Sequence, residues 1–337
     1  MTSPAAAERP HDLRVWYMTT GEAGTHQQAR GLAQELSADA QEHLLRVSRF
    51  WALMPPALFS LSLRGVSSLC GRLEPPWPDV LVTCGRRSAL AAMAVRRRNP
   101  APMVTVHIQP PGVPSAFDLV VAMAHDRIEG PNIQHIATAL HGIRAGALAD
   151  AAALGDPRFR DLPRPWTGVL VGGSTRRAAF TSANANCLAD QLDDLRAESG
   201  GALLITPSRR TPDAVVAALR GRYADDPTAF LWDGRGANPY LPILASCDRL
   251  VVTSDSISMI SEALATVAEV RIFDVPGHRR HARFVADLVA RNLVARLGGP
   301  PPPERRSGCD ATPAVAASVR RLAAAKLGRV APPAPPR

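Results

Sequence analysis

The residues best suited to chemistry lie between Leu250 and Ala263, where an apolar run meets a group of hydroxyl and carboxylate side chains. Residues 250–253 predict a buried strand, and the polar residues after them predict a tight turn that opens a helix. The first turn of a helix holds unpaired backbone N–H groups and the positive end of the helix dipole, which favour an anion such as phosphate. A helix that is merely well capped needs one of these hydroxyls, so both interpretations stay open.

Within this stretch the candidate ligand-binding residues are Ser254, Asp255, Ser256, Ser258 and Glu262. The hydroxyls and the helix start could contact the phosphates of a ligand. A carboxylate one turn further along the helix could accept two hydrogen bonds from a ribose diol. The alternative is that Glu262 only interacts favourably with the N-terminal end of the helix dipole.

A second candidate loop, Gly172-Gly173-Ser174, follows the predicted strand at residues 167–171. Two glycines allow a backbone to turn tightly and to approach a ligand closely. A simple connection between a strand and a helix would use the same residues. The glycine pair alone therefore does not distinguish a ligand-binding loop from such a connection.

A third candidate loop contains Ser208, Arg209 and Arg210 and also follows a predicted strand. Two adjacent arginines at the end of a strand can hold a diphosphate. A solvated, charged loop is the alternative. Thr211 is expected to cap the next helix, with Pro212 as the first helical residue.

The first half of the chain offers candidates for proton transfer. His125 and Asp126 directly follow the predicted strand at residues 117–122, and either could act as a general base toward an acceptor hydroxyl. His107 and His26 are further candidates. A single histidine is more often structural than catalytic, so these two carry less weight.

The elements that position these residues alternate between strand and helix, which indicates parallel sheets with right-handed crossovers. The glycines after the first strand do not form G-x-G-x-x-G, so the dinucleotide-binding signature is absent. The expected fold class is α/β, with two Rossmann-like domains facing a cleft lined by the carboxyl ends of both sheets. The predicted strands are 13–18, 43–47, 79–83, 103–109, 117–122, 133–138, 167–171, 202–206, 229–232, 249–253 and 270–273, and the predicted helices are 26–36, 84–98, 182–198, 238–246, 281–291, 313–327 and the one opened by Thr211.

Composition places the expected domain boundary in an alanine-rich and then proline-rich segment. The expected parts are a disordered N-terminus at 1–12, an N-terminal Rossmann-like domain at 13–150, a linker at 151–165, a C-terminal Rossmann-like domain at 166–298, and a proline-rich segment with a short helix and a disordered tail at 299–337.

The formal charge of +9 favours acidic partners, and nearly all of the positive charge comes from arginine. Aromatic residues are only 5% of the chain, and no basic run is interleaved with them, so nucleic-acid binding is not expected. The five cysteines are scattered without metal-ligand spacing, which indicates reduced thiols in a cytosol and no metal site: Cys70, Cys84, Cys187, Cys247 and Cys309. Neither a secretory signal nor a membrane-spanning run is recognisable, so a cytoplasmic location is expected.

The segment Phe50–Leu63 is strongly apolar, contains two prolines and is flanked by arginines. It is too short to span a bilayer. Either it is a core helix preceded by a loop, or it is an amphipathic surface segment that contacts anionic lipid on the inner membrane. Packing in the core is the more common role for such a segment.

Many short motifs, in order, are similar to the bacterial relatives of the plant mitochondrial-fission protein family named for its elongated-mitochondria mutant. The resemblance covers roughly residues 13–297. It rests on residues 28–33 (QARGLA), 84–88 (CGRRS), 107–109 (HIQ), 117–120 (FDLV), 125–126 (HD), 130–132 (GPN), 208–212 (SRRTP), 238–240 (NPY), 253–256 (TSDS), 259 (M) and 261–263 (SEA). His26 matches no family position that we can identify.

The family resembles two-domain glycosyltransferases of the GT-B type. The Gly-Gly-Ser and Ser-Glu motifs are similar to those of the lipid-linked N-acetylglucosaminyltransferase of peptidoglycan synthesis. This second, shorter resemblance implies that the C-terminal domain, with Asn238 among its binding residues, holds a nucleotide-diphosphate sugar as substrate without a separate cofactor. It also implies that Glu262 binds the ribose and that Ser256 and Ser258 lie at the phosphates, while the acceptor would be a lipid-linked or cell-envelope glycan.

Two other functions stay open. Departures from the family pattern at Pro110–Gly112, Met123–Ala124, Val267 and Glu269 suggest a protein that keeps the fold but has lost catalysis and acts through protein interactions. A nucleotide-sugar epimerase or dehydrogenase is the third reading. The missing dinucleotide signature, and a single lysine that lies far downstream, Lys326, argue against it.

Overall fold

The computed structural model describes residues 13–48, 63, 66–174, 179–277, 279–303 and 307–328. The chain divides into two compact units. Unit 1 comprises the residues up to Gly142 and those from Ala311 onward, and unit 2 comprises Ile143–Asp310. Both units are built on parallel sheets, which confirms the expected α/β class with two Rossmann-like domains.

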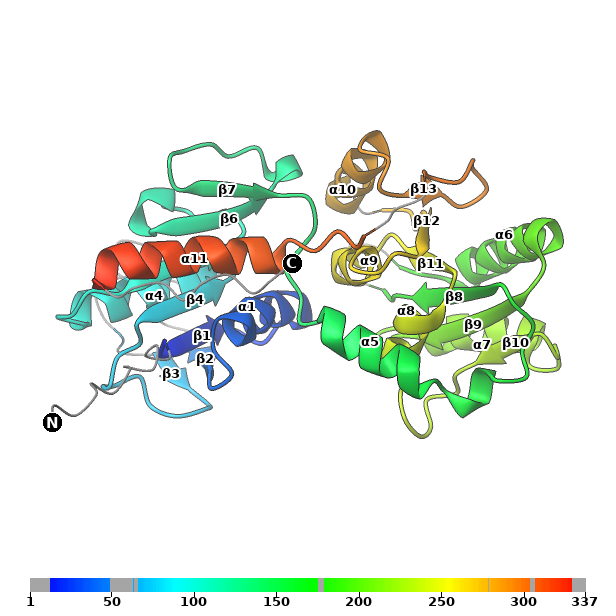
Figure 1. The fold of residues 1–337 in the computed structure, drawn as a ribbon, viewed down its shortest axis with the longest axis horizontal. Coiled ribbons are helices and arrows are strands. Elements are labelled where there is room, and N and C mark those ends of the chain that lie inside the picture. Colours follow the sequence, from blue (N-terminus) through cyan, green and yellow to red (C-terminus); the bar gives the residue numbers. More distant parts are fainter. Residues whose placement is uncertain are drawn as a thin grey trace, which may run out of the picture. The chain divides into compact units, whose positions relative to one another are not determined.

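Within the described residues, unit 1 contains a seven-stranded sheet in the order β3-β2-β1-β4-β5-β6-β7 (Figure 1). The pairs are parallel except for β2 and β3, which run antiparallel. The strands are β1 (Val15–Thr19), β2 (Gln41–Val47), β3 (Val66–Ser68), β4 (Val80–Cys84), β5 (Val104–Ile108), β6 (Leu119–Met123) and β7 (Ile133–Ile136), and the helices are α1 (Ala23–Leu36), α4 (Arg86–Arg98) and α11 (Thr312–Leu327).

The central strands of unit 1 are buried along their whole length. Every residue of β1, β4, β5 and β6 is buried, as expected for continuous apolar runs covered on both faces. The short strand β3 at the edge is only partly buried. Both faces of the sheet are therefore covered along these strands.

Helix α11 returns the chain to unit 1 after unit 2 is complete. Its buried stripe includes Val315, Val319 and Ala323, and it packs against α1 and β5. The Nζ atom of Lys326 lies 2.6 Å from Oδ1 of Asp118, and this pairing lowers the pKa of Asp118 against the effect of burial. The helix expected at 313–327 therefore belongs to unit 1, whereas composition predicted a separate C-terminal segment for these residues.

Unit 2 contains a second parallel sheet, which within the described residues has six strands in the order β10-β9-β8-β11-β12-β13. Its strands are β8 (Trp166–Val171), β9 (Ala202–Pro207), β10 (Ala229–Leu231), β11 (Arg249–Thr253), β12 (Glu269–Phe273) and β13 (Ala295–Arg296), and its helices are α5 (Ala145–Leu154), α6 (Ser182–Ser199), α7 (Asp213–Tyr223), α8 (Tyr240–Ser246), α9 (Ile257–Leu264) and α10 (Arg279–Ala290).

The expected linker is folded into unit 2. Alanine-rich residues form α5, which packs against α8, and the following turn buries Phe159. Alanine has the highest intrinsic helix propensity, so this segment forms a helix without an amphipathic pattern. The structure places the boundary at Gly142–Ile143 rather than within the expected linker at 151–165.

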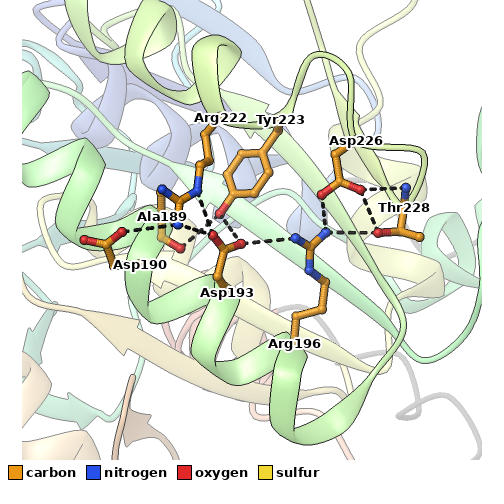
Figure 2. A network of polar contacts seen from close by, with 8 residues as sticks. All are labelled: Ala189, Asp190, Asp193, Arg196, Arg222, Tyr223, Asp226 and Thr228. Carbon is orange, nitrogen blue, oxygen red and sulfur yellow. Dashed lines mark hydrogen bonds and ion pairs between the residues drawn. The ribbon is translucent and has the colours of Figure 1, made fainter.

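A network of ion pairs and hydrogen bonds joins α6, α7 and the turn before β10 (Figure 2). Asp193 lies at its centre and accepts hydrogen bonds from Arg222 (2.8 Å), Arg196 (3.2 Å) and the hydroxyl of Tyr223 (3.1 Å). Arg196 also contacts Asp226 at 2.5 Å. Because the aromatic ring of Tyr223 belongs to the unit 2 core, the network ties the two helices to that core.

Some expectations fall on residues that the structure does not describe. These are the disordered N-terminus at 1–12 and the end of the tail after residue 328. Of Phe50–Leu63, only Leu63 is described, and it is buried in the unit 1 core with Trp16. A surface role for this segment stays a prediction.

Replacing Asp193 by Ala is expected to lower the free energy of unfolding of unit 2 by about 1–3 kcal/mol, because two arginines and a tyrosine hydroxyl lose their common acceptor. The matched control is Asp190→Ala, since Asp190 is exposed and forms one contact of 3.4 Å with Arg222. The control should change stability by less than about 0.5 kcal/mol. Thermal unfolding followed by circular dichroism measures both, and equal effects would contradict a central role for Asp193.

Candidate functional site

The carboxyl edge of the unit 2 sheet brings together the three loops singled out in the sequence. They follow β8, β9 and β11, which are neighbours in the sheet. The backbone N–H of Gly172 donates to Oγ1 of Thr253 (2.8 Å), and Oγ1 of Thr211 donates to the carbonyl oxygen of Gly172 (2.5 Å). Direct hydrogen bonds therefore join these three loops, as expected from their positions in the sheet.

Neighbouring protein atoms leave no room for a side chain at Gly172 or Gly173. A Cβ added at Gly172 would lie 2.1 Å from Oδ2 of Asp255, and one added at Gly173 would lie 2.1 Å from the carbonyl oxygen of Arg210. The backbone N–H of Gly173 donates to Oδ2 of Asp255 at 2.7 Å. These contacts account for both glycines within unit 2 itself, without the ligand that the sequence interpretation invoked.

Asp255 is a buried anchor for the loop after β8. Its side chain is 2% exposed, and burial raises the pKa of its carboxyl group despite the hydrogen bonds that it accepts and the nearby charge of Arg210. Its Oδ1 atom has no hydrogen-bond partner in the described part of the chain. The carboxylate accepts the hydrogen bond of the Gly173 backbone N–H, which a phosphate could otherwise accept.

The two serines flanking Asp255 also serve the fold. Ser256 is the N-cap of α9, accepting from the N–H of Met259 at 3.4 Å. The Ser254 hydroxyl accepts from the N–H of Val275 at 2.8 Å, and the Ser254 carbonyl oxygen lies 3.1 Å from Nδ1 of His281. Both hydroxyls therefore already have partners within unit 2.

The groups left for a ligand lie on the exposed side of the same edge. Arg209 and Arg210 are exposed, and Ser258 is partly exposed in the first turn of α9. Within the described residues, the side chains of these three residues form no hydrogen bond. Two cationic groups and a hydroxyl beside the N-terminus of a helix are suited to anionic oxygens.

Glu262 is hydrogen-bonded to Tyr240. The sequence predicted Tyr240 only as part of the start of a helix. The Tyr240 hydroxyl at the beginning of α8 donates to Oε2 of Glu262. Burial raises the pKa of Glu262 to about 6, and the hydrogen bond from Tyr240 opposes this effect. Asn238 accepts from the backbone N–H of Tyr240 (2.9 Å), so it fixes the start of α8, and its contact with a ligand stays a prediction.

The remaining predicted loop residues have local roles. The Ser174 hydroxyl accepts from the N–H of Phe180 at 2.9 Å, and the Ser208 hydroxyl lies 3.1 Å from Oγ1 of Thr211. Thr211 was expected to cap the following helix, but that prediction is wrong. Pro212 is the N-cap of α7, and Thr211 instead links the end of β9 to β8.

In unit 1, His125 and Asp126 lie in a short 3-10 turn directly after β6. The Nε2 atom of His125 is 3.6 Å from Oδ1 of Asp126, and the two side chains are 5% and 7% exposed. Oδ2 of Asp126 also accepts the N–H of Met123 at 3.1 Å. These contacts stabilise the turn, and a catalytic role for the pair stays a prediction.

His107 is suited to a structural role. Its ring is 1% exposed, its Nδ1 atom lies 2.8 Å from Oγ1 of Thr83, and burial lowers its pKa to about 3. It is therefore neutral at physiological pH.

The described residues contain no group of three or more potential metal ligands. Among the same residues, no helix has both the length and the apolar character needed to cross a bilayer.

The fold of the chain is that of the GT-B class. The solved structure of Os79 from O. sativa, in complex with UDP, is similar over 91% of this chain and 90% of its own, with a TM-score of 0.51 and 11% identity. The UDP-GlcNAc 2-epimerase from Methanocaldococcus jannaschii is similar over 92% of this chain and 99% of its own, with a TM-score of 0.50 and 10% identity. At such low identity the similarity concerns the fold alone.

The family model described as Mitochondrial fission ELM1 matches residues 23–323, and the chain belongs to this family. The Mitochondrial fission protein ELM1 of Arabidopsis thaliana is 29% identical over 269 residues, or 72% of this chain. The match spans 63% of the length of the plant protein.

The contact between Gly172 and Asp255 predicts a specific coupling. Gly172→Ala should lower the free energy of unfolding by about 1–3 kcal/mol or more through overpacking. The cost should shrink in an Asp255→Ala background, because the atom that Cβ would meet is gone.

Two matched variants serve as controls for that double-mutant cycle. Gly173→Ala meets a backbone carbonyl and should not be relieved by Asp255→Ala. Gly221→Ala in α7 meets nothing within 4 Å and should be neutral or slightly stabilising. Thermal unfolding measures all of these variants, and additive effects of Gly172→Ala and Asp255→Ala would refute the contact.

The raised pKa of Glu262 predicts a pH-dependent contribution to stability. The folded state holds this proton more tightly than the unfolded chain, since the pKa is about 6 instead of 4.5. The stabilisation is therefore complete below pH 4.5 and is lost as the pH rises through about 6. Relative to Glu262→Gln, which stays neutral, the wild-type protein should lose roughly 2 kcal/mol over this range.

Unfolding in urea at pH 4, 5, 6 and 7 measures this difference. Tyr240→Phe is the matched control: without the donated hydrogen bond, the pKa of Glu262 should be higher still, and the loss should move to higher pH. A pH-independent difference between wild type and Glu262→Gln would contradict the raised pKa.

Proposed function

We propose that the chain is a GT-B-type glycosyltransferase in which unit 2 binds a nucleotide-diphosphate sugar at the carboxyl edge of its sheet. The observation that carries the proposal is the group formed by Arg209, Arg210, Ser258 and the first turn of α9. These groups are accessible and lie at the edge where parallel α/β sheets bind ligands.

In the proposed site the arginines and the start of α9 bind the diphosphate. Glu262 accepts hydrogen bonds from the ribose, with Tyr240 fixing the orientation of its carboxyl group. The same cationic groups would stabilise the negative charge that develops on the diphosphate as it leaves. The acceptor, a lipid-linked or cell-envelope glycan, would be held by unit 1.

A second candidate is a protein that keeps the fold without catalysis and acts as an adaptor. The observation that favours it is the carboxylate of Asp255, which already occupies the N–H of Gly173 and fills the space beside Gly172. The adaptor hypothesis predicts that no nucleotide sugar is consumed.

The test is a nucleotide-binding experiment with the full chain. UDP, GDP, ADP and CMP, each alone and as a sugar conjugate, are titrated by calorimetry and by thermal shift. At least one should bind and raise the melting temperature. Arg210→Gln should weaken binding by about 10- to 100-fold, because it removes a charged hydrogen bond to phosphate.

The matched control is Arg220→Gln, since Arg220 is exposed and lies in the last turn of α7, at the opposite end of that helix from Arg210. It should leave binding unchanged. Binding of none of the nucleotides would overturn the proposal. Incubation of UDP-N-acetylglucosamine with the wild-type protein then separates the activities: transfer or hydrolysis releases UDP, epimerisation yields the 2-epimer, and the adaptor leaves the sugar nucleotide intact.

A further inference from the structure

An open cavity lies within unit 2, between α6, β12 and the segment that follows β13; these elements are labelled in Figure 1. Its volume is about 230 Å³, which equals the space of about eight waters at roughly 30 Å³ each. Pockets for drug-sized ligands have volumes of roughly 300–1,000 Å³. The cavity is smaller, so it suits a small ligand.

This cavity is separate from the candidate site at the carboxyl edge of the sheet. Its lining residues on α6 come from the second half of that helix. Helix α6 ends at Ser199 and β9 begins at Ala202, so this half of α6 lies near the amino ends of the strands. Arg209 and Arg210 follow the carboxyl end of β9, on the opposite edge.

The floor of the cavity contains the guanidinium group of Arg271, from the middle of β12. The Arg271 side chain is only 7% exposed. Its Nε lies 2.5 Å from Oε1 of Glu269, and its Nη1 donates to the carbonyl oxygen of Gly299 at 3.0 Å. The same carboxylate oxygen of Glu269 also lies 3.3 Å from Nε of Arg249.

The floor therefore carries a surplus positive charge, because two arginines share the carboxylate of Glu269. Nη2 of Arg271 forms no hydrogen bond within the described part of the chain. A nearly buried guanidinium with an unused N–H donor favours an anionic oxygen as its partner.

The rim of the cavity carries the opposite charge. Asp194 and Glu198 lie one turn apart on α6, and both are exposed. Neither carboxylate forms an ion pair or a hydrogen bond among the residues that the structure describes. Leu195, Pro300 and Pro301 add apolar surface between the floor and the rim. The cavity thus combines a cationic floor, an anionic rim and an apolar wall within a small space.

We propose that this cavity binds a free α-amino acid. The carboxylate of the ligand accepts a hydrogen bond from Nη2 of Arg271, and its ammonium group lies at the carboxylates of Asp194 and Glu198. Its side chain packs against the apolar wall. An α-amino acid carries both charges on one carbon atom, whereas each end of a peptide carries only one of them, so the charge pattern favours the free amino acid. This site is independent of the proposed glycosyl transfer.

The first test is binding of the standard L-amino acids to the full chain, followed by thermal shift and then by calorimetry. At least one of them should bind saturably and raise the melting temperature. The amide of that amino acid lacks the carboxylate, and its N-acetyl derivative lacks the ammonium group. Each derivative should bind at least about 10-fold more weakly, because it loses one charge-assisted contact.

The second test uses variants of the cavity. The double variant Asp194→Asn/Glu198→Gln changes only exposed side chains and should weaken binding by about 10- to 100-fold. Arg271→Lys should weaken it similarly, because lysine lacks the planar fork of donors. If Arg271→Lys fails to fold, the double variant still tests the site. The matched control is Asp225→Asn, since Asp225 is exposed and does not line the cavity, and it should bind like the wild type.

Several outcomes would overturn the proposal. One is the absence of saturable binding by every amino acid. Another is equal binding of the amide or the N-acetyl derivative, or full binding by the double variant at the rim. Arg210→Gln should bind the amino acid like the wild type, and a loss there would place the ligand at the carboxyl edge instead. Failure to bind any nucleotide refutes the proposed function alone and leaves the amino-acid site in place.

Discussion

The close approach of Asp255 to Gly172 and Gly173 is the constraint on which the carboxyl edge of unit 2 depends. The carboxylate occupies the space that a Cβ at Gly172 would need and accepts the N–H of Gly173. Thr253 and Thr211 bind the two sides of the same peptide segment, so the ends of β9, β8 and β11 form one hydrogen-bonded unit. Hydrogen bonds between buried polar groups thus join these loops, with Oδ1 of Asp255 left without a partner in the described part of the chain.

This constraint divides the polar side chains at the edge into those that hold the loops together and those that remain accessible to a ligand. Asp255, Ser254 and Ser256 have protein partners, whereas Arg209 and Arg210 remain accessible. The proposed ligand therefore contacts the exposed side of the edge and does not enter the glycine turn. Membership in the Mitochondrial fission ELM1 family and the GT-B fold are compatible with this division of roles, because sites of different function occur on the same fold.

The sequence predicted the fold well because apolar runs alternate with helical patterns in both halves. It missed α5, whose alanines form a helix by propensity without an amphipathic pattern. It also placed α11 in a separate segment, since the packing of Val315 against unit 1 is a long-range contact that no local pattern reveals. At the candidate site, the sequence indicated the loops but not the contacts between their side chains. The hydrogen bond from Tyr240 to Glu262, for example, joins residues 22 positions apart, which no local pattern reveals.

The central claim is that unit 2 binds a nucleoside diphosphate at the exposed side of this edge. Hydrogen–deuterium exchange of the full chain, with and without saturating UDP, tests it most directly. The account predicts slower exchange on binding in peptides that cover Ser208–Thr211 and the start of α9, while the rest of the chain changes little. Exchange that is unaffected by UDP at these peptides, or protection confined to unit 1, would contradict it.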